Sequence, residues 1–351
     1  MTISTVLLVG FLFAADPAQT PTKTPEPDAL RTLSRSVRAL AQRVSPAVVQ
    51  IHVSGYGPVE EEDGRAASII SPQRSLGSGV IVDRGGYIVT NAHVVRGAVK
   101  VRVLLASTAK GLAGIPLEAR IVGIDRESDL ALIKVAQDGL PTLRFGNSNA
   151  LRQGDVVLAI GSPLGLRNSV SMGIVSSASR AVNEESPMEY VQTDASINPG
   201  NSGGALVNVD GALMGINTFI LSQSGGSEGI GFAIPSNTVR NVYTQLKQKG
   251  HVHRGTVGIA AQTITPVMAE ALGLARQIGV IAADVEPDGP AERAGVKRGD
   301  ILLSMDGRVL DSARQLDSGV YRRQKGEKAA LKILRAQDEM DVSVEVDELE
   351  N

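Results

Sequence analysis

The chain has 351 residues, which is enough for two or three domains, and its net charge is −2 with no block of basic residues. This balance argues against binding to nucleic acid or to an anionic membrane surface. Aromatic residues make up only 3%, and the absence of cysteine excludes disulfides, thiolate nucleophiles and cysteine-ligated zinc.

The N-terminus begins with an apolar run over residues 3–15. This run is too short to span a membrane comfortably and is typical of the apolar part of a secretory signal. Residues 16–29 are rich in Pro, Thr and acidic side chains, as in disordered tethers. We therefore expect a signal peptide or short N-terminal anchor at 1–15 and a disordered tether at 16–29.

The next part of the chain predicts one helix followed by many strands. Apolar residues recur at helical spacing over 30–44, and Pro46 ends the pattern. The polar stretch 56–75 is expected to be a surface loop. Hairpin turns are expected at 84–86 and 210–211. Strands are expected at 48–53, 79–82, 87–90, 99–105, 119–124, 130–135, 155–160 and 169–176. This density of strands without intervening helices predicts a β-barrel or sandwich.

A second helix marks the expected domain boundary. Pro235 and Ser236 open it, with Ser236 expected as the N-cap, and Gly250 closes it. Residues 251–254 are the expected linker. The part of the chain beyond them has mixed strand and helix patterns, with a predicted hairpin turn at Asp306-Gly307 and a predicted helix over 312–323.

Histidine is the usual base for a serine nucleophile, and the chain has four. His251 and His253 fall in the linker, where two ligands without a third are a weak indication of a metal site. His52 lies within a Val-rich strand and is expected to be structural. His93 is left as the candidate base, at the end of a strand that can present its side chain.

A histidine base needs a carboxylate to fix its tautomer and orientation. Asp129 lies where a polar loop enters an apolar strand, so it is expected to be held rigidly. Asp125 and Glu127 are close rivals, but both fall in the polar turn and are expected to be solvated. The pattern favours Asp129.

The segment around Ser202 has the composition of a nucleophile loop. Glycine lets backbone approach a substrate closely, and the N–H groups of Gly200 and Ser202 can converge on one oxyanion. The alternative is a glycine-rich turn with an incidental serine. The chain order His93, Asp129, Ser202 argues against that alternative, because triad order differs between fold families.

These residues stand in segments that resemble the HtrA (DegP-like) serine proteases, namely TNAHVV at 90–95, SDLALIKV at 128–135 and TDASINPGNSGGAL at 193–206. The resemblance runs from about Val44 to the C-terminus. It implies a mainly β fold, with a chymotrypsin-like double β-barrel protease domain over 30–250. A single α+β PDZ domain over 251–351 is implied to follow.

The resemblance also implies roles for single residues of the protease domain. Gly200 and Ser202 would form the oxyanion hole, and Thr218 would sit behind the histidine. Ile197 and Ile220 would line a small apolar S1 pocket, which implies cleavage after Val, Ile, Ala or Leu. On the residues alone, both isoleucines are equally well explained as core packing.

In the PDZ domain, the segment 254–259 resembles the loop that binds a peptide carboxylate. The backbone N–H groups of Val257, Gly258 and Ile259 can cradle that carboxylate while the peptide adds as a strand. Thr256 departs from the family, where an aromatic residue is common at this place.

The resemblance implies an ATP-independent endopeptidase of the bacterial cell envelope, periplasmic or secreted, that acts on unfolded or mislocalised polypeptides. Its expected partners are unfolded chains, C-terminal peptides and two further copies of itself in a homotrimer. No cofactor, metal, nucleic acid or strong membrane association is expected. The alternative is a chaperone or stress sensor with latent proteolysis, gated by the PDZ domain through the loops 182–189 and 221–228.

Overall fold

The computed structural model describes residues 28–60, 66–105, 114–162, 169–182, 188–222, 225–274, 279–321 and 323–349. The expected signal or anchor and most of the expected tether lie outside these residues. None of the helices in these ranges is both long enough and apolar enough to cross a membrane. The chain divides between Ala39 and Leu40 into two units.

The predicted first helix is present as α1, Asp28–Val44, and continues into the 3-10 turn η1, Ser45–Ala47. Only its last part is buried, at Leu40 and Val44. Pro46 lies in the first turn of η1, where its missing N–H removes no helical hydrogen bond.

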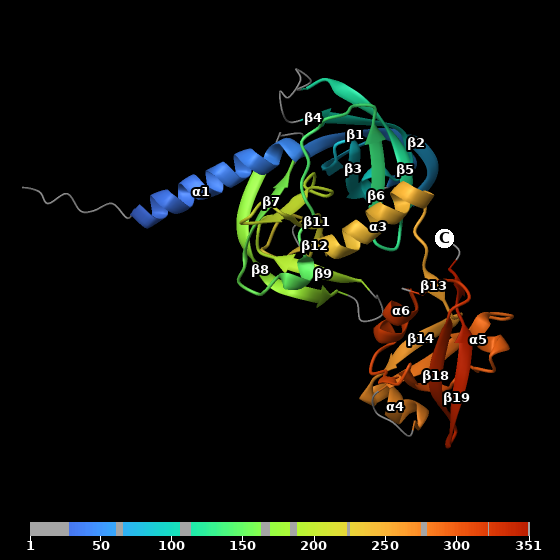
Figure 1. Cartoon of the computed structure of the whole chain (residues 1–351). Coiled ribbons are helices and arrows are strands. Elements are labelled where there is room, and N and C mark those ends of the chain that lie inside the picture. The colour runs from blue at the N-terminus through green and yellow to red at the C-terminus, as the bar shows by residue number, and fades with distance from the viewer. Residues whose placement is uncertain are drawn as a thin grey trace, which may run out of the picture. The chain divides into compact units, whose positions relative to one another are not determined.

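Six antiparallel strands then close into a first barrel in the order β1-β2-β3-β6-β5-β4 (Figure 1). Its interior is filled with aliphatic side chains such as Ile51, Ile88 and Ile133, each 0% exposed. Branched side chains of this kind pack well on a pleated surface. The strands are β1 Val48–Glu60, β2 Ala66–Asp83, β3 Tyr87–Asn91, β4 Ala98–Leu105, β5 Pro116–Asp125 and β6 Leu130–Val135, with the short helix α2 Ala92–Val95 between β3 and β4.

The expectation of a surface loop over 56–75 is wrong. Strands β1 and β2 continue through this stretch as the two arms of a hairpin, with Tyr56 opposite Pro72 and Pro58 opposite Ile70. Pairing with the opposite arm satisfies the backbone N–H and C=O groups of this stretch, whatever the polarity of its residues. The polar composition therefore did not reveal the strands. Residues 61–65 lie outside the described residues.

A second barrel of six antiparallel strands follows in the order β10-β11-β12-β9-β8-β7. The predicted turn at 210–211 joins its paired strands β10 and β11, just as the turn at 84–86 joins β2 and β3. The strands are β7 Val156–Gly161, β8 Ser169–Ala181, β9 Glu189–Thr193, β10 Ala205–Asn208, β11 Leu213–Ile220 and β12 Gly231–Pro235, and the 3-10 turn η3 Ser148–Ala150 precedes them.

The helix α3, Ser236–Lys249, packs against strands of both barrels, on β5 and β6 of the first and β11 and β12 of the second. Its buried face contains Val239, Val242 and Leu246, and Gly250 ends it with a left-handed φ of 80°. The prediction of Ser236 as N-cap is wrong, because Pro235 holds that position. The Ser236 hydroxyl instead donates to the Gly146 carbonyl at 3.1 Å and ties the helix to the preceding segment.

The C-terminal part has a sheet in the order β14-β15-β16-β18-β19, with β17 paired to β16 and a separate pair β13–β20. The helix predicted over 312–323 is present as α6 with Leu316 and Val320 buried, and Asp306-Gly307 forms the predicted turn between β16 and β17. The elements are β13 Gly255–Thr256, β14 Ile259–Ile264, α4 Pro266–Leu272, β15 Gly279–Val285, α5 Pro290–Arg293, β16 Ile301–Met305, β17 Arg308–Val309, α6 Ala313–Tyr321, β18 Lys328–Arg335, β19 Asp338–Glu345 and β20 Asp347–Glu348.

The packing of the first barrel predicts the effect of removing a core side chain. Ile88 is fully buried and a Cβ built on Gly79 would lie 2.6 Å from its Cγ2 atom, so little space surrounds it. Ile88→Ala should reduce the free energy of unfolding of this domain by about 2–5 kcal/mol. Val99→Ala, at a side chain 72% exposed, should change it by less than about 0.5 kcal/mol. Urea unfolding followed by circular dichroism measures both, and equal effects would contradict the assigned core.

Candidate active site

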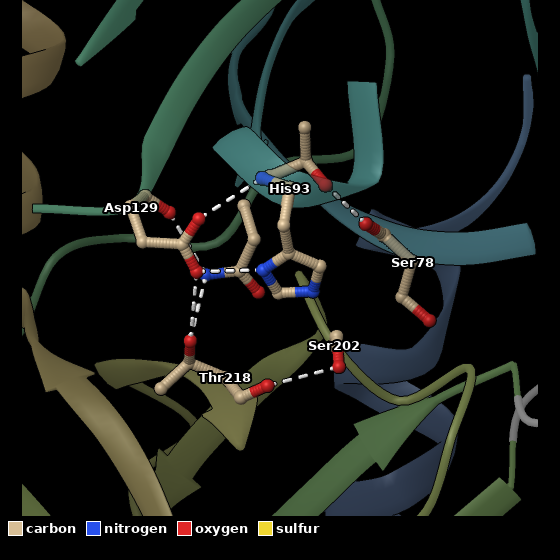
Figure 2. Close-up of polar contacts among 7 residues, drawn as sticks. Ser78, His93, Asp129, Ser202 and Thr218 are labelled. Atoms are coloured by element: carbon tan, nitrogen blue, oxygen red, sulfur yellow. Dashed lines mark hydrogen bonds and ion pairs between the residues drawn. The ribbon is translucent and has the colours of Figure 1, made fainter. Parts of the chain in front are cut away.

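His93 and Asp129 are brought together at one edge of the first barrel. His93 lies in α2, directly after β3, and its side chain is exposed, while Asp129 precedes β6 with a left-handed φ of 52°. The His93 Nδ1 atom lies 2.7 Å from Asp129 Oδ2, and the His93 backbone N–H donates to Asp129 Oδ1 at 2.9 Å (Figure 2). One carboxylate therefore fixes both the ring and the backbone of the histidine.

Thr218 of the second barrel completes the surroundings of this carboxylate. Its hydroxyl donates to Asp129 Oδ2 at 3.1 Å. Burial alone would raise the pKa of Asp129, but the hydrogen bonds and charge of His93, with the Thr218 hydroxyl, hold that pKa below its ordinary value of 3.8. The carboxylate is therefore ionised at neutral pH, as the partner of a catalytic histidine must be.

Ser202 lies in a tight turn between β9 and β10. Figure 2 shows the His93 ring lying between the Asp129 carboxylate and the Ser202 hydroxyl. In this rotamer the Ser202 Oγ atom donates to the Thr218 carbonyl at 2.9 Å. To donate to His93 instead, the hydroxyl would have to rotate about the Ser202 Cα–Cβ bond, between the staggered rotamers open to serine.

The backbone of this turn depends on glycine. Gly200 and Gly203 have φ of 100° and 83°, a region that side chains disfavour. A Cβ on Gly203 would also lie 2.1 Å from the Ser78 carbonyl oxygen. Within the described part of the chain, the N–H groups of Gly200 and Ser202 donate to no other group. Two unpaired donors at one turn suit an anionic oxygen.

Ile197 and Ile220, the two predicted S1 residues, both belong to the apolar interior of the second barrel. Ile197 is 2% exposed, and Ile220 is partly buried against the same cluster. A Cβ on Gly231 would lie 2.9 Å from the Ile197 Cδ1 atom, so Ile197 packs directly against the Gly231 backbone. The apolar surroundings of both isoleucines suit a small aliphatic side chain, and their S1 role stays a prediction.

The predicted carboxylate loop of the PDZ domain has an unexpected internal bond. Thr256 ends β13, Val257 is buried, and Ile259 begins β14. The Gly258 N–H donates to the Thr256 hydroxyl at 3.0 Å, so one of the three predicted carboxylate donors is already occupied. Having Thr256 where the family commonly has an aromatic residue thus has two effects. The side chain is smaller, and fewer N–H groups of the loop are free to bind a carboxylate.

The expectation that Asp125 is solvated is wrong, whereas its neighbour Glu127 is exposed. Asp125 is 1% exposed and accepts two hydrogen bonds of 2.6 Å from the Arg254 guanidinium. The Ser128 hydroxyl donates to the same carboxylate. Buried charges are paired in this way because an unpaired one is very unfavourable, and the pairing leaves Asp125 unavailable to His93.

The remaining histidines lie apart from His93. The Nε2 atom of His52 is buried in β1 without a hydrogen-bond partner in the described structure, and burial lowers the pKa of this residue. His253 Nδ1 lies 2.9 Å from Glu348 Oε1, with His251 Nε2 3.8 Å from the same oxygen. The described residues contain no cluster of three side chains suited to a metal ion.

Two polar residues of the site escaped the reasoning from sequence. The Asn91 side chain donates to the Thr218 hydroxyl at 3.1 Å and to the Asp129 carbonyl at 3.0 Å. The Ser78 hydroxyl of β2 donates to the Gly200 carbonyl, in the turn over residues 199–203 around Ser202, which we call the nucleophile turn. Asn91 stands only two residues before His93, and Ser78 stands between Gly77 and Gly79. Glycines inside a strand often mark the close approach of another backbone. The two glycines beside Ser78 were therefore the feature of the sequence that could have indicated a contact there.

Comparisons with known proteins agree with this geometry. Residues 77–216 match the trypsin-like peptidase domain, and residues 255–346 match the PDZ domain. The chain is 43% identical to a probable periplasmic serine endoprotease DegP-like of Halomonas elongata, over 78% of this chain and 56% of that protein. It is 41% identical to a protein of the same description from a Marinomonas species, over 87% of this chain and 70% of that protein. The chain spans about half the length of the curated relatives it matches first.

Solved structures extend the likeness to nearly the whole chain. The HtrA-type protease AlgW with decapeptide is 36% identical, with a TM-score of 0.78 over 89% of this chain and 98% of that one. The serine endoprotease from Yersinia pestis is 35% identical, with a TM-score of 0.68 over the same shares. The two barrels and the PDZ domain thus occur together in both, and the chain belongs to the HtrA family of serine proteases, with a trypsin-like peptidase domain followed by one PDZ domain.

Proposed function

We propose that this chain is a serine endopeptidase that hydrolyses peptide bonds of unfolded or mislocalised proteins in the bacterial periplasm without ATP. The observation that carries the proposal is the carboxylate–imidazole pair of Asp129 and His93, which faces the Ser202 hydroxyl. The described relatives are named periplasmic serine endoproteases, which supports both the activity and the compartment.

The proposed reaction follows from the arrangement of these groups. Ser202 Oγ attacks the carbonyl carbon of the scissile bond while His93 takes the serine proton, and Asp129 orients the ring and stabilises its charged form. The N–H groups of Gly200 and Ser202 donate to the oxyanion. His93 then passes the proton to the leaving amine, and water hydrolyses the acyl-enzyme by the same steps. Apolar Ile197 and Ile220 favour cleavage after Val, Ile, Ala or Leu.

The proposed role of the PDZ domain is to bind C-terminal or exposed hydrophobic peptides beside β14, through the loop from Thr256 to Ile259. Two related structures are of AlgW with a decapeptide and with a tripeptide. The alternative of a binding protein with latent proteolysis is less favoured, because the chain has a full set of catalytic groups. Residues 183–187 and 223–224 of the proposed gating loops lie outside the described residues.

A homotrimer is proposed as the working form. Exposed apolar side chains follow the outer face of β7 and β8 as a stripe of Val156, Val170, Met172 and Ile174. Leu30 and Leu33 of α1 are exposed as well, at 64% and 48%. Contiguous exposed apolar residues of this kind often mark contacts between protein chains.

The nucleophile is tested by Ser202→Ala, with Ser177→Ala as the control, because Ser177 is a serine of β8 whose hydroxyl donates only locally, to Ser179. We expect Ser202→Ala to reduce kcat on β-casein by about 10⁴–10⁶-fold and to abolish labelling by a fluorophosphonate. The control should keep both. Digestion or labelling by Ser202→Ala at the wild-type rate would refute the proposed function.

The carboxylate is tested by Asp129→Asn, with the exposed neighbour Glu127→Gln as its control. An amide in place of Asp129 would stabilise the wrong histidine tautomer, so kcat should fall by about 10⁴-fold. Because folding lowers the pKa of Asp129, this carboxylate stabilises the fold at neutral pH and loses its effect as pH falls through that pKa. The stability gap between wild type and variant should therefore shrink below about pH 4. A gap that grows on acidification would contradict the assigned hydrogen bonds.

The loop of the PDZ domain is tested by Thr256→Val, which frees the Gly258 N–H for a ligand carboxylate. We expect peptides with a free C-terminus to bind about 2–10-fold more tightly, because no internal hydrogen bond has to be broken. Thr265→Val is the matched control, since its hydroxyl accepts from the Met268 N–H at the start of α4. Isothermal titration with free and amidated peptides measures the effect. An equal gain for the amidated peptide would show that the carboxylate is not the group recognised.

A further inference from the structure

We propose that Ser78 is a positioning residue whose buried hydroxyl holds the Gly200 peptide in the orientation needed for the oxyanion hole. The inference rests on the proposed endopeptidase function. Ser78 belongs to β2 of the first barrel, 122 residues from Gly200 in the chain. It touches no reacting atom, so its effect passes through the nucleophile turn.

The Ser78 side chain joins two segments of the second barrel. Its hydroxyl donates to the Gly200 carbonyl at 2.6 Å and accepts from the Ser162 N–H at 2.8 Å. Ser78 is 0% exposed and Ser162 is 2% exposed, whereas Gly200 is half-buried. Losing the hydroxyl leaves the buried Ser162 N–H without a partner, which is unfavourable, and releases the Gly200 carbonyl from its restraint.

The backbone of Ser78 is bonded to the same region. Its N–H donates to the Ser202 carbonyl at 2.8 Å, and its own carbonyl accepts from the Thr90 hydroxyl at 2.7 Å. Thr90 lies in β3, three residues before His93. Every polar atom of Ser78 is therefore engaged, and its position is fixed relative to both the histidine strand and the nucleophile turn.

A bond to the Gly200 carbonyl matters because of how a peptide backbone rotates. Each residue has two soft dihedrals, so the direction of its N–H depends on φ and the direction of its carbonyl on ψ. Gly200 has a φ of 100°, and glycine can leave this conformation easily because no side chain restrains it. The Ser78 hydroxyl holds the Gly200–Asn201 peptide, whose N–H closes a turn onto the Asn198 carbonyl at 2.9 Å. With both sides of this peptide bonded, the turn from Asn198 to Asn201 keeps its shape, and we infer that the Gly200 N–H within it keeps its direction toward the oxyanion.

The restraint acts at a tightly packed contact. A Cβ on Gly161, the residue before Ser162, would lie 2.5 Å from the Asn201 Oδ1 atom. The segment that donates to Ser78 thus packs directly on the nucleophile turn. A shift of either hydroxyl partner of Ser78 would therefore be transmitted to the turn that contains Gly200.

The test compares Ser78→Ala with Ser236→Ala in the full chain. Ser236 is the matched control, because it is also 0% exposed and its hydroxyl donates to a carbonyl, that of Gly146, at the start of α3. Both variants should lose thermal stability. For Ser78→Ala alone, kcat on a fluorogenic peptide with Val before the cleaved bond should fall about 10–100-fold, with KM changed less than about twofold. Outright removal of an oxyanion donor reduces kcat by roughly 10²–10³-fold, and a displaced donor should do less.

A peptide aldehyde ending in valinal gives the second readout. Its adduct with Ser202 places an oxygen in the oxyanion hole, as the transition state does, so its inhibition constant should rise by the same factor as kcat falls. Ser78→Cys keeps the shape of the side chain but donates only weakly, and it should show an intermediate loss. It replaces Ser78→Ala in the comparison if the alanine variant does not fold.

The outcomes separate this inference from the proposed function. A wild-type protein that neither cleaves the peptide nor reacts with a fluorophosphonate would refute the proposed function. An active wild type with a folded Ser78→Ala or Ser78→Cys variant of undiminished kcat would refute the positioning role alone. The positioning role would also be refuted if Ser236→Ala lost as much kcat as Ser78→Ala. It would likewise be refuted if Ser78→Ala raised KM and left kcat unchanged. Either result would assign Ser78 a purely structural role.

Discussion

The hydrogen bonds between β2 of the first barrel and the nucleophile turn of the second are the constraint on which the site depends. His93 and Asp129 come from the first barrel, whereas Ser202 and Thr218 come from the second. Neither barrel holds the complete set of proposed catalytic groups. The bond from the Ser78 N–H to the Ser202 carbonyl and the bond from Thr218 to Asp129 set the register between the two halves. We call this set of bonds between the two barrels the seam. Small displacements at the seam would separate His93, the proposed base, from Ser202, the proposed nucleophile.

Much of the fold followed from local patterns in the sequence. Strand runs, glycine turns and the helix from Ser236 to Lys249 depend on neighbouring residues, so periodicity and turn chemistry were sufficient to predict them. The choice of Asp129 also followed from local context, since it abuts a buried strand. The reason for rejecting Asp125 was wrong, however, because that carboxylate is buried against Arg254, which lies 129 residues away in the chain.

What the sequence could not supply was the partner of each buried polar group. The pattern around Ser78 predicts a strand, and the flanking glycines indicate the close approach of another backbone without identifying Gly200 as the partner of the hydroxyl. The hydroxyl of Ser236 illustrates the same limit, since it has the composition of an N-cap but donates to Gly146 instead. Hydrogen bonds between distant segments depend on the closed barrels, and single-residue propensities carry no information about that closure.

The most direct test of this account is the hydrogen exchange of the Ser78 amide, followed by NMR in the full chain. In β2 this N–H donates to Ser202 in the other barrel, so its protection reports on the seam itself. The account predicts that it exchanges as slowly as the amides that hold the first barrel together, because the seam would open only when that barrel opens. Exchange several orders of magnitude faster, at a rate typical of loops, would show that the two barrels are not held in register and would contradict the account.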